Sequence, residues 1–531
     1  MLNLLLFSCA RVGAPNGGTR DSLAPKFLGS NIDTTRLNVS RTVKELRLDF
    51  DEYVMLKDFN KNFNVSPPIK KIKKVIPSNL ANKYVLIQWE DTLQANTTYN
   101  FNFGNAIVDN NESNPLPYFN FAFSTGDKID DLFVSGTVKD AMTLIKENQT
   151  AKDNKMVVGL YKAGENLDYK QKPDYITKVD EENYFELNFL PKGEFVIIAF
   201  DDENQNSVYD AGKEKVSFLK EKITLDSTSV RGLKLKLYPS KKVVKYKESK
   251  AINGGLLMTF EGNPETVEVK SLSEELKDFK VTHAKRSDSV NIWFDAEKSN
   301  LGGTVSKQVK LSYFTPTISD TISVSYKAVK DEFKLSNEAG NLIAPENNFV
   351  INTSLPIENL NTSSWKLESD SIAQDFTAKI SEKNPFKILV NSSFKPTKKY
   401  VLTIPKETVS SYYSSNDKSF QFQFEIDKPE NYGSFTAVIK NKPTAKFWVE
   451  LTNEKGEILC SQFTNESEVS FKNLKPATYI ARIRVDNNGN GFWDEADFAQ
   501  NIAAEDVYIF EKEINVRPLW EIKEDWELTN R

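Results

Sequence analysis

Histidine is almost missing from this chain of 531 residues, in which His283 is the only one. General acid–base catalysis and the Ser- or Cys-based triads usually depend on a histidine. His283 stands in the stretch Val281–Ala284 without a cysteine or an acidic cluster beside it, and the sequence has no GxSxG, phosphate-binding loop, HExxH or CxxC motif. We therefore expect a protein that is not an enzyme, with His283 as a satisfied or exposed side chain. A hydrolase that works with two carboxylates is the open alternative, because sequence does not show their separation in space.

Cysteine is nearly as scarce, with two in the chain. Cys9 ends the apolar run Leu2–Phe7, and the order Leu6-Phe7-Ser8-Cys9 resembles the lipobox of bacterial lipoproteins, whose signal is cut before a cysteine that carries a diacylglycerol. The resemblance implies that residues 1–8 are a signal peptide, that Cys9 is lipidated and that residues 9–25 form a flexible tether. Residues 1–8 lack the basic start and the full apolar length of such signals. A signal truncated at its start and an ordinary buried strand that ends in a free cysteine are the alternatives.

Long apolar runs and basic clusters are missing as well. No other stretch approaches the ~20 apolar residues of a transmembrane helix, so membrane attachment is expected through Cys9 alone. The net charge of -5 is spread along the chain without a basic stripe, so nucleic acid is not an expected partner. With Cys9 lipidated, Cys460 has no partner for an intrachain disulfide, and we expect it to be a small buried hydrophobe.

Aromatic residues are abundant instead, with 35 Phe and 19 Tyr against 5 Met. Apolar and polar residues alternate in short runs such as Tyr84–Trp89 and Val290–Phe294, which is typical of half-buried strands. The sequence therefore predicts an all-β protein. At ~100–200 residues per domain, its length implies three to five domains.

Two pairs of segments repeat along the chain. Leu93–Phe103 matches Phe394–Ile404, 301 positions later, and Leu190–Asp210 matches Leu474–Asp494, 284 positions later. The unequal steps indicate a segment of variable length between the paired modules. The predicted order is a first module, a second module, a spacer, and then the two modules again.

The first module resembles a known family. The runs Leu48–Val54, Asp91–Tyr99 and Phe121–Gly126 are similar to the bacterial Ig-like domain (SbsA type) of Bacteroidetes lipoproteins, and the likeness extends from Cys9 to Asp127. The short alternating runs of this module and the turn clusters between them predict a seven-stranded β-sandwich. The family has no established activity that could be transferred to this chain.

The second module is similar to another kind of sandwich. Val134–Asp140, Val157–Tyr161 and Leu190–Phe200 resemble strands of prealbumin-like or carboxypeptidase-regulatory-like domains. The resulting prediction is an extended array of tandem Ig-like and prealbumin-like β-sandwiches. Its segments are the signal peptide (1–8), the lipidated cysteine and tether (9–25), an Ig-like domain (26–127), a prealbumin-like sandwich (128–239), a β-sandwich spacer (240–332), a second Ig-like domain (333–429) and a second prealbumin-like sandwich (430–531).

A loop in the last module has the spacing of a calcium-binding loop of the EF-hand kind. Oxygen ligands at alternate positions can converge on one hard cation, Gly491 at the sixth position allows the sharp bend, and the seventh residue offers its backbone carbonyl. The candidate ligands at positions 1, 3, 5, 7, 9 and 12 are Asp486, Asn488, Asn490, Phe492, Asp494 and Asp497. A strand precedes the loop instead of a helix, and aspartate at position 12 reaches less far than glutamate. A solvated Asx/Gly turn without metal is the alternative.

The corresponding loop of the first copy keeps part of this pattern. Its candidate ligands are Asp202, Asn204, Asn206 and Asp210. Ser207 replaces the glycine, and Lys213 stands at the twelfth position, where it cannot bind a cation, although Glu214 could substitute. Calcium would have a structural role here, and no catalytic cofactor is expected. Tyr209 and Trp493 occupy the same place in the two loops and are expected to pack on their sandwiches.

Together these patterns predict a non-enzymatic, lipid-anchored protein of the bacterial outer membrane. It would act as a scaffold or interaction subunit within a larger outer-membrane or envelope protein complex. The stretch Ala10–Val12 lacks the acidic run that resembles the surface-export signal of Bacteroidetes lipoproteins, which favours the periplasmic face over the cell surface. A surface adhesin or glycan-binding protein is the alternative function.

Overall fold

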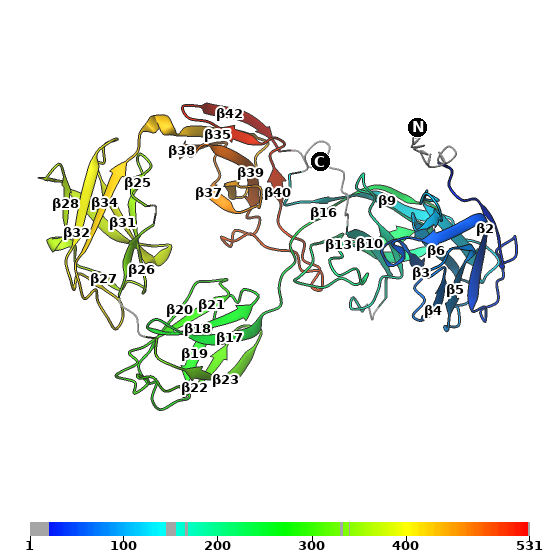
Figure 1. Ribbon diagram of the computed structural model, residues 1–531, viewed down its shortest axis with the longest axis horizontal. Helices are drawn as coiled ribbons and strands as arrows, with labels where there is room; N and C mark the ends of the chain where they lie inside the picture. The colour runs from blue at the N-terminus through cyan, green and yellow to red at the C-terminus, as the bar shows by residue number, and fades with distance from the viewer. Residues whose placement is uncertain (1–20, 145–154, 165–167, 330–332, 339, 529–531) are drawn as a thin grey trace, which may run out of the picture. The chain divides into compact units, whose positions relative to one another are not determined.

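The alternation of apolar and polar residues produces strands throughout the computed structural model, which is all-β as predicted (Figure 1). The structure describes residues 21–144, 155–164, 168–329, 333–338 and 340–528. Within these ranges the helical elements are α1 (Phe59–Asn62), η1 (Thr362–Ser364) and η2 (Pro429–Asn431). No helix in the described part of the chain is long and apolar enough to cross a membrane. The expected signal peptide, Cys9 and residues 10–20 of the expected tether lie outside the described residues.

The chain separates into two compact units near Leu237, apart from two short segments that group with the second unit. The described residues bury five hydrophobic clusters, two in the first unit and three in the second. Each cluster lies between the sheets of one β-sandwich, which is how half-apolar sheets remove their apolar faces from water. One of the five also includes Trp293 from the preceding sandwich.

The first sandwich of the first unit has an aromatic core. Its strands are β1 (Phe27–Ser30), β2 (Glu45–Leu56), β3 (Asn64–Ser66), β4 (Ile72–Ile76), β5 (Asn82–Trp89), β6 (Thr98–Gly104), β7 (Ile107–Asp109) and β8 (Phe119–Ser124). One sheet has the order β1-β2-β5-β4, with β7 also paired to β2, and the other has the order β3-β6-β8. Phe101 and Phe103 of β6 and Phe121 and Phe123 of β8 are buried in the core, because alternate residues of a strand face the same side.

The second sandwich of the first unit follows directly. Its strands are β9 (Leu132–Asp140), β10 (Met156–Lys162), β11 (Tyr175–Lys178), β12 (Tyr184–Leu190), β13 (Gly193–Asp201), β14 (Val216–Phe218), β15 (Ile223–Leu225) and β16 (Val230–Leu237). They form a sheet β12-β9-β16 and a sheet β11-β10-β13-β14, in which β15 also pairs with β13.

The second unit begins with a sandwich of four and three strands. These are β17 (Lys245–Ile252), β18 (Gly255–Glu261), β19 (Glu268–Ser271), β20 (Lys280–His283), β21 (Ser289–Trp293), β22 (Lys307–Phe314) and β23 (Ser319–Tyr326). Their orders are β17-β18-β21-β20 and β19-β22-β23. Alternating residues such as Val309 and Leu311 of β22 supply its core.

A sandwich with a core around Phe349 and Phe424 comes next. Its strands are β24 (Leu335–Asn337), β25 (Leu342–Ile343), β26 (Phe349–Thr353), β27 (Asn359–Leu360), β28 (Lys366–Ser369), β29 (Ile372–Ala373), β30 (Phe376–Ser381), β31 (Asn384–Ser392), β32 (Lys399–Ile404), β33 (Val409–Ser410) and β34 (Phe420–Ile426). The sheets are β24-β26-β31-β30, β25-β34-β32-β28-β29 and the pair β27-β33. Antiparallel pairing of β32 with β34 repeats the pairing of β6 with β8.

The last sandwich repeats the topology of the second one strand for strand. It contains β35 (Gly433–Lys440), β36 (Phe447–Thr452), β37 (Ile458–Thr464), β38 (Glu468–Leu474), β39 (Ala477–Val485), β40 (Val507–Ile509), β41 (Ile514–Val516) and β42 (Glu521–Glu527). The sheets are β38-β35-β42 and β37-β36-β39-β40, with β41 also on β39. The central strands β13 and β39 belong to the segments whose repetition is visible in the sequence.

Candidate functional site

The first predicted loop follows β13 and is built by side chains that accept hydrogen bonds from the backbone of the loop. Asp202, with 3% exposure, accepts from the amides of Asn206 and Ser207, both at 3.0 Å. The side-chain oxygen of Asn204 accepts from the Asn206 amide at 3.0 Å, and that of Asn206 accepts from the Val208 amide at 2.6 Å. Asp and Asn favour such turns, so the local sequence is sufficient to form this loop.

Glu214, just beyond the first loop, accepts hydrogen bonds from backbone amides near both ends of the loop. Its Oε1 accepts from the Glu203 amide at 3.0 Å, and its Oε2 accepts from the Asp210 amide at 2.8 Å. The Asn204 Nδ2 donates to Asp210 Oδ2 at 2.6 Å, so all four predicted ligands of this loop and Glu214 belong to one network of hydrogen bonds. Burial, together with the charges of Asp202 and Asp210, raises the pKa of Glu214 to about 7.

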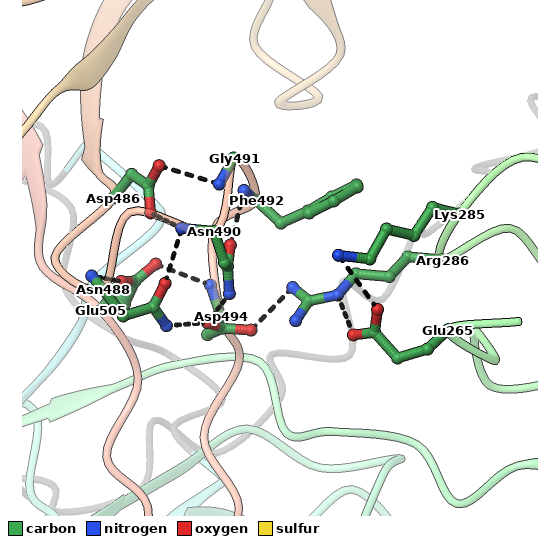
Figure 2. A network of polar contacts seen from close by, with 10 residues as sticks. All are labelled: Glu265, Lys285, Arg286, Asp486, Asn488, Asn490, Gly491, Phe492, Asp494 and Glu505. Carbon is green, nitrogen blue, oxygen red and sulfur yellow. Dashed lines mark hydrogen bonds and ion pairs between the residues drawn. The ribbon is translucent and has the colours of Figure 1, made fainter. Parts of the chain in front are cut away.

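The second predicted loop, after β39, repeats these bonds (Figure 2). Asp486, also 3% exposed, accepts from the amides of Asn490 and Gly491, both at 3.0 Å. The side-chain oxygen of Asn490 accepts from the Phe492 amide at 2.7 Å, and Asn490 Nδ2 donates to Asp494 Oδ2 at 2.8 Å. The two loops therefore have the same hydrogen-bonded frame.

Glu505 occupies the place beside the second loop that Glu214 occupies beside the first. Its Oε1 accepts from the Asn488 amide at 3.1 Å, and its Oε2 accepts from the Asp494 amide at 3.0 Å. Asp497 lies elsewhere, in a short bridge with Ile502, where its Oδ1 accepts from the Gln500 amide at 3.2 Å. The structure thus brings the predicted residues from 486 to 494 together, but not Asp497. Glu505 was missed because it lies beyond the twelve-residue window of the motif.

The positively charged side chain of Arg286, from another sandwich of the same unit, contacts the second loop. Arg286 donates from Nη1 to Asp494 Oδ1 at 2.7 Å and from Nε to Glu265 Oε1 at 2.5 Å (Figure 2). Its Cζ lies 4.7 Å from the centre of the Phe492 ring, and the Nζ of Lys285 lies 5.1 Å from the same ring. These distances suit cation–π contacts, so Phe492 serves here as a side-chain contact for two cations.

The two acids of the second loop respond differently to their surroundings. Burial raises the pKa of Asp494, but hydrogen bonds from Asn488, Arg286 and Asn490 outweigh it and hold the pKa below its usual range. At Glu505 burial dominates and raises the pKa. Among the described residues, no group of three or more His, Cys, Asp and Glu side chains is arranged to hold a metal ion. Calcium can also bind the oxygens of Asn side chains and of backbone carbonyls, which are not among these four residue types. Calcium in either loop therefore stays a prediction.

The aromatic residues of the two loops pack on their sandwiches, as expected. The Tyr209 ring, 7% exposed, lies 6.0 Å from the ring of Phe200 on β13. The Trp493 ring lies 5.8 Å from the Cζ of Arg484 on β39, and its Nε1 donates to the carbonyl of Glu505 at 3.1 Å.

His283 and Cys460 have structural surroundings. A ring nitrogen of His283 lies 3.0 Å from the carbonyl oxygen of Ser287, four residues along. Cys460 is half-buried and packs against the core of the last sandwich, and burial raises the pKa of its thiol. It is less buried than expected because its strand, β37, is at the edge of its sheet.

A polar cavity in the first unit is the feature that the motif search missed. Its volume is about 910 Å³, and residues of the β3-β6-β8 sheet and of strands β11 and β12 line it. The Ile176 amide of β11 donates to Ser66 Oγ of β3 at 3.2 Å at this boundary. Seven asparagines line the cavity: Asn62, Asn64, Asn100, Asn102, Asn105, Asn120 and Asn188. The available signal was the alternation of Asn with aromatic residues in β6.

The fold defines the protein as an all-β array of successive sandwiches. More particularly, residues 21–125 match the family model of the bacterial Ig-like domain, which covers the first sandwich. The Ig-like resemblance seen in the sequence is confirmed for this segment. No curated protein matches the chain.

Solved structures with matches to much of the chain have low identity to it. The crystal structure of the S-layer protein rSbsC(31-844) is 12% identical, with 93% of this chain and 67% of that chain covered and a TM-score of 0.15. The Bacillus anthracis TIE protein is 11% identical, with 97% and 76% covered and a TM-score of 0.13. BcpA, the major pilin subunit of Bacillus cereus, is 11% identical, with 75% and 99% covered and a TM-score of 0.13. Scores this low support no inference about the function of this chain.

Proposed function

We propose that this protein is a non-enzymatic, lipid-anchored component of the cell envelope that acts as a scaffold or interaction subunit. The observation that carries the proposal is the series of sandwiches, each with its own buried core. Because each core stabilises its own sandwich, the outer faces can vary and contact partners without loss of the fold. The Ig-like match at residues 21–125 agrees with such a role.

Two of the five acids that line the cavity, Asp180 and Glu186, support a binding role over hydrolysis. Asp180 Oδ1 accepts from the backbone amides of Glu182 and Tyr184, at 2.9 and 2.8 Å. Glu186 Oε2 accepts from the Tyr184 hydroxyl at 2.7 Å. A two-carboxylate hydrolase needs one acid as a proton donor and another as a base or nucleophile, whereas these carboxylates are engaged in holding their own strand and turn.

Affinity purification tests the scaffold role. The full chain would carry a C-terminal tag and be purified from gently solubilised outer membranes, and mass spectrometry would identify the proteins that accompany it. We expect a membrane protein in stoichiometric amount. Recovery of the tagged protein alone would contradict the scaffold role.

The anchor has its own control in the same experiment. Replacement of the proposed lipid-bearing thiol, Cys9→Ala, should release the protein from the membrane fraction and abolish its labelling by a fatty-acid analogue. A Cys9→Ala protein that stays in the membrane fraction without lipid would show that the attachment does not depend on Cys9.

A second candidate function is a surface adhesin or glycan-binding protein. The polar, asparagine-lined cavity of the first unit favours it, because binding sites are concave and place a few polar groups to orient a ligand. This candidate predicts binding by the purified protein without any membrane partner.

A further inference from the structure

The cavity of the first unit contains a row of amide side chains across three strands. The strand register pairs Asn64 of β3 with Asn102 of β6, and Asn102 with Asn120 of β8. The intervening residues Phe101 and Phe121 point into the core, so this row lies on the opposite face of the sheet. All three asparagines line the cavity.

Two asparagine side-chain oxygens in the lining of the cavity, one of them in this row, lack a hydrogen-bond partner. Asn100, which is 7% exposed, has a buried Oδ1 without a hydrogen bond, and so does Asn64. Buried acceptors almost always have a donor in folded proteins. Because both residues line the cavity, a hydroxyl group of a bound molecule, reached after a small rotation of the amide, would supply it.

Two exposed tyrosines stand at the same cavity. Tyr118 is 69% exposed, and its backbone is held at a φ of 52° by Asn105, whose Oδ1 accepts from its amide, and by Asn120, whose Nδ2 donates to its carbonyl. Tyr184 of β12 is 39% exposed, and its hydroxyl bonds to Glu186. Tyrosine offers a flat apolar face with a polar edge and orders at little entropic cost, which suits contact with a ring-shaped polar ligand.

The charges around the cavity restrict the class of ligand. Its lining has five carboxylates and three lysines, which disfavours nucleic acids and acidic saccharides. Amide groups both donate and accept hydrogen bonds, as sugar hydroxyls do. The volume of about 910 Å³ lies within the range of small-ligand sites.

We propose that this cavity binds a neutral oligosaccharide. The asparagine row hydrogen-bonds the hydroxyl groups of the sugar, and Tyr118 and Tyr184 lie against its rings. The inference rests on the second candidate function above and names its site and ligand class; it does not depend on the scaffold role.

The second Ig-like segment supplies a matched control. The positions 301 residues after Asn102 and Asn120 are Thr403 of β32 and Gln421 of β34, which are paired across the strands in the same way. Gln421 is exposed. A Gln421→Ala substitution therefore removes an equivalent amide from an equivalent strand outside the cavity.

The test uses the full chain and an array of neutral and acidic oligosaccharides, followed by calorimetric titration with the neutral oligosaccharide that binds best. We expect Tyr118→Ala to weaken binding about tenfold, which corresponds to one lost ring contact. Asn120→Ala should weaken it by at least as much, because the Asn120 amide also holds the Tyr118 carbonyl. Gln421→Ala should bind as the unaltered protein does. Melting curves would verify that the variants are folded. If Asn120→Ala does not fold, Tyr118→Ala still tests the proposal, because Tyr118 is exposed.

Hydrogen exchange locates the ligand. Saturation with the oligosaccharide should slow exchange in β6, β8 and β12 of the full chain. Binding of acidic saccharides alone, absence of any glycan binding, equal affinity of all variants, or protection outside these strands would each overturn the proposal. None of these results affects the membrane-protein capture that tests the scaffold role.

Discussion

The second and last sandwiches have the same topology and the same loop, but different charges beside that loop. In the last sandwich Glu450 is fully buried and pairs across the strands with Arg482. Its Oε2 accepts from Nε and Nη2 of Arg482 at 2.9 and 2.7 Å, and its Oε1 accepts from Arg484. In the second sandwich the positions 284 residues before the two arginines are Ile198 and Phe200, both fully buried.

The loops themselves differ in how their acids are compensated. In the last sandwich, Asp494 is paired with Arg286, which comes from another sandwich of the same unit. Among the described residues no lysine or arginine pairs with Asp210, the corresponding acid of the second sandwich, and the pKa of Glu214 is raised beside it. The comparison shows that local sequence builds the loop frame in both places. Distant residues decide which charges stabilise it.

The largest expected effect comes from breaking the buried ion cluster of the last sandwich. Glu450→Ala leaves Arg482 and Arg484 without their shared carboxylate, and we expect a loss of about 3–5 kcal/mol in the free energy of unfolding of this sandwich. Urea-dependent hydrogen exchange of β36 and β39 measures this sandwich separately from the others.

A triple substitution sharpens the same comparison. Glu450→Leu, Arg482→Ile and Arg484→Phe together make this face of the last sandwich apolar, although the second sandwich has Gly159, not leucine, opposite Ile198. Because apolar replacement of a buried ion cluster is often neutral or stabilising, we expect stability within about 1 kcal/mol of the unaltered protein. A triple variant as unstable as Glu450→Ala would show that the charges themselves are required.

The next effect is common to both loops. Asp202 and Asp486 each accept two backbone hydrogen bonds. Asp202→Ala or Asp486→Ala leaves the amide of Ser207 or Gly491 unpaired, whereas the amide of Asn206 or Asn490 keeps its bond to the neighbouring asparagine side chain. We expect each variant to lose about 2 kcal/mol of local stability, measured in the presence of a chelator. Clearly unequal losses would contradict an identical loop frame.

The pH dependence should distinguish the two sandwiches. The pKa of Glu214 in the folded protein is raised from 4.5 to about 7, so its contribution to stability is complete below about pH 4.5 and is lost as the pH rises through about 7. The second sandwich should therefore become less stable from about pH 5 to 8 in metal-free buffer. Glu214→Gln, followed by hydrogen exchange across this range, should flatten that profile; an unchanged slope would exclude Glu214 as its cause.

The smallest effect concerns the partly exposed contact of Arg286. The side chains of Arg286 and Asp494 are 23% and 25% exposed, and such pairs contribute about 1 kcal/mol or less. Arg286→Ala should lower the stability of the loop at 486–494 by this amount in hydrogen exchange. Lys285→Ala is the matched control, because Lys285 contacts the same Phe492 ring without a bond to Asp494, and it should have a smaller effect than Arg286→Ala.

The sequence predicted those strands and loops whose residues interact with neighbours a few positions away along the chain. Alternation in β6, β8, β13 and β39 predicts the strands, since a half-buried strand needs a period of two. The Asp-x-Asn-x-Asn spacing predicts both loops, because each side chain bonds to amides within five residues. These parts follow from neighbours along the chain.

Long-range partners were not predictable in this way. Glu505 reaches the loop from 17 residues beyond Asn488, and Arg286 reaches Asp494 across 208 positions. The asparagine row becomes a cavity wall only because another sandwich of the same unit stands against it. Nothing in the sequence around Asn100 distinguishes a covered face from one that is open to solvent.

A structure of the protein crystallised with calcium would test the central claim most directly. The claim is that charges from distant residues decide which of the two similar loops binds calcium. The sequence favours the second loop for calcium, whereas Arg286 already provides a positive charge at Asp494. We predict calcium among Asp202, Asn206 and Asp210 in the first loop, with Arg286 retained at Asp494 in the second. Calcium in the second loop with Arg286 displaced, or in neither loop, would contradict the account.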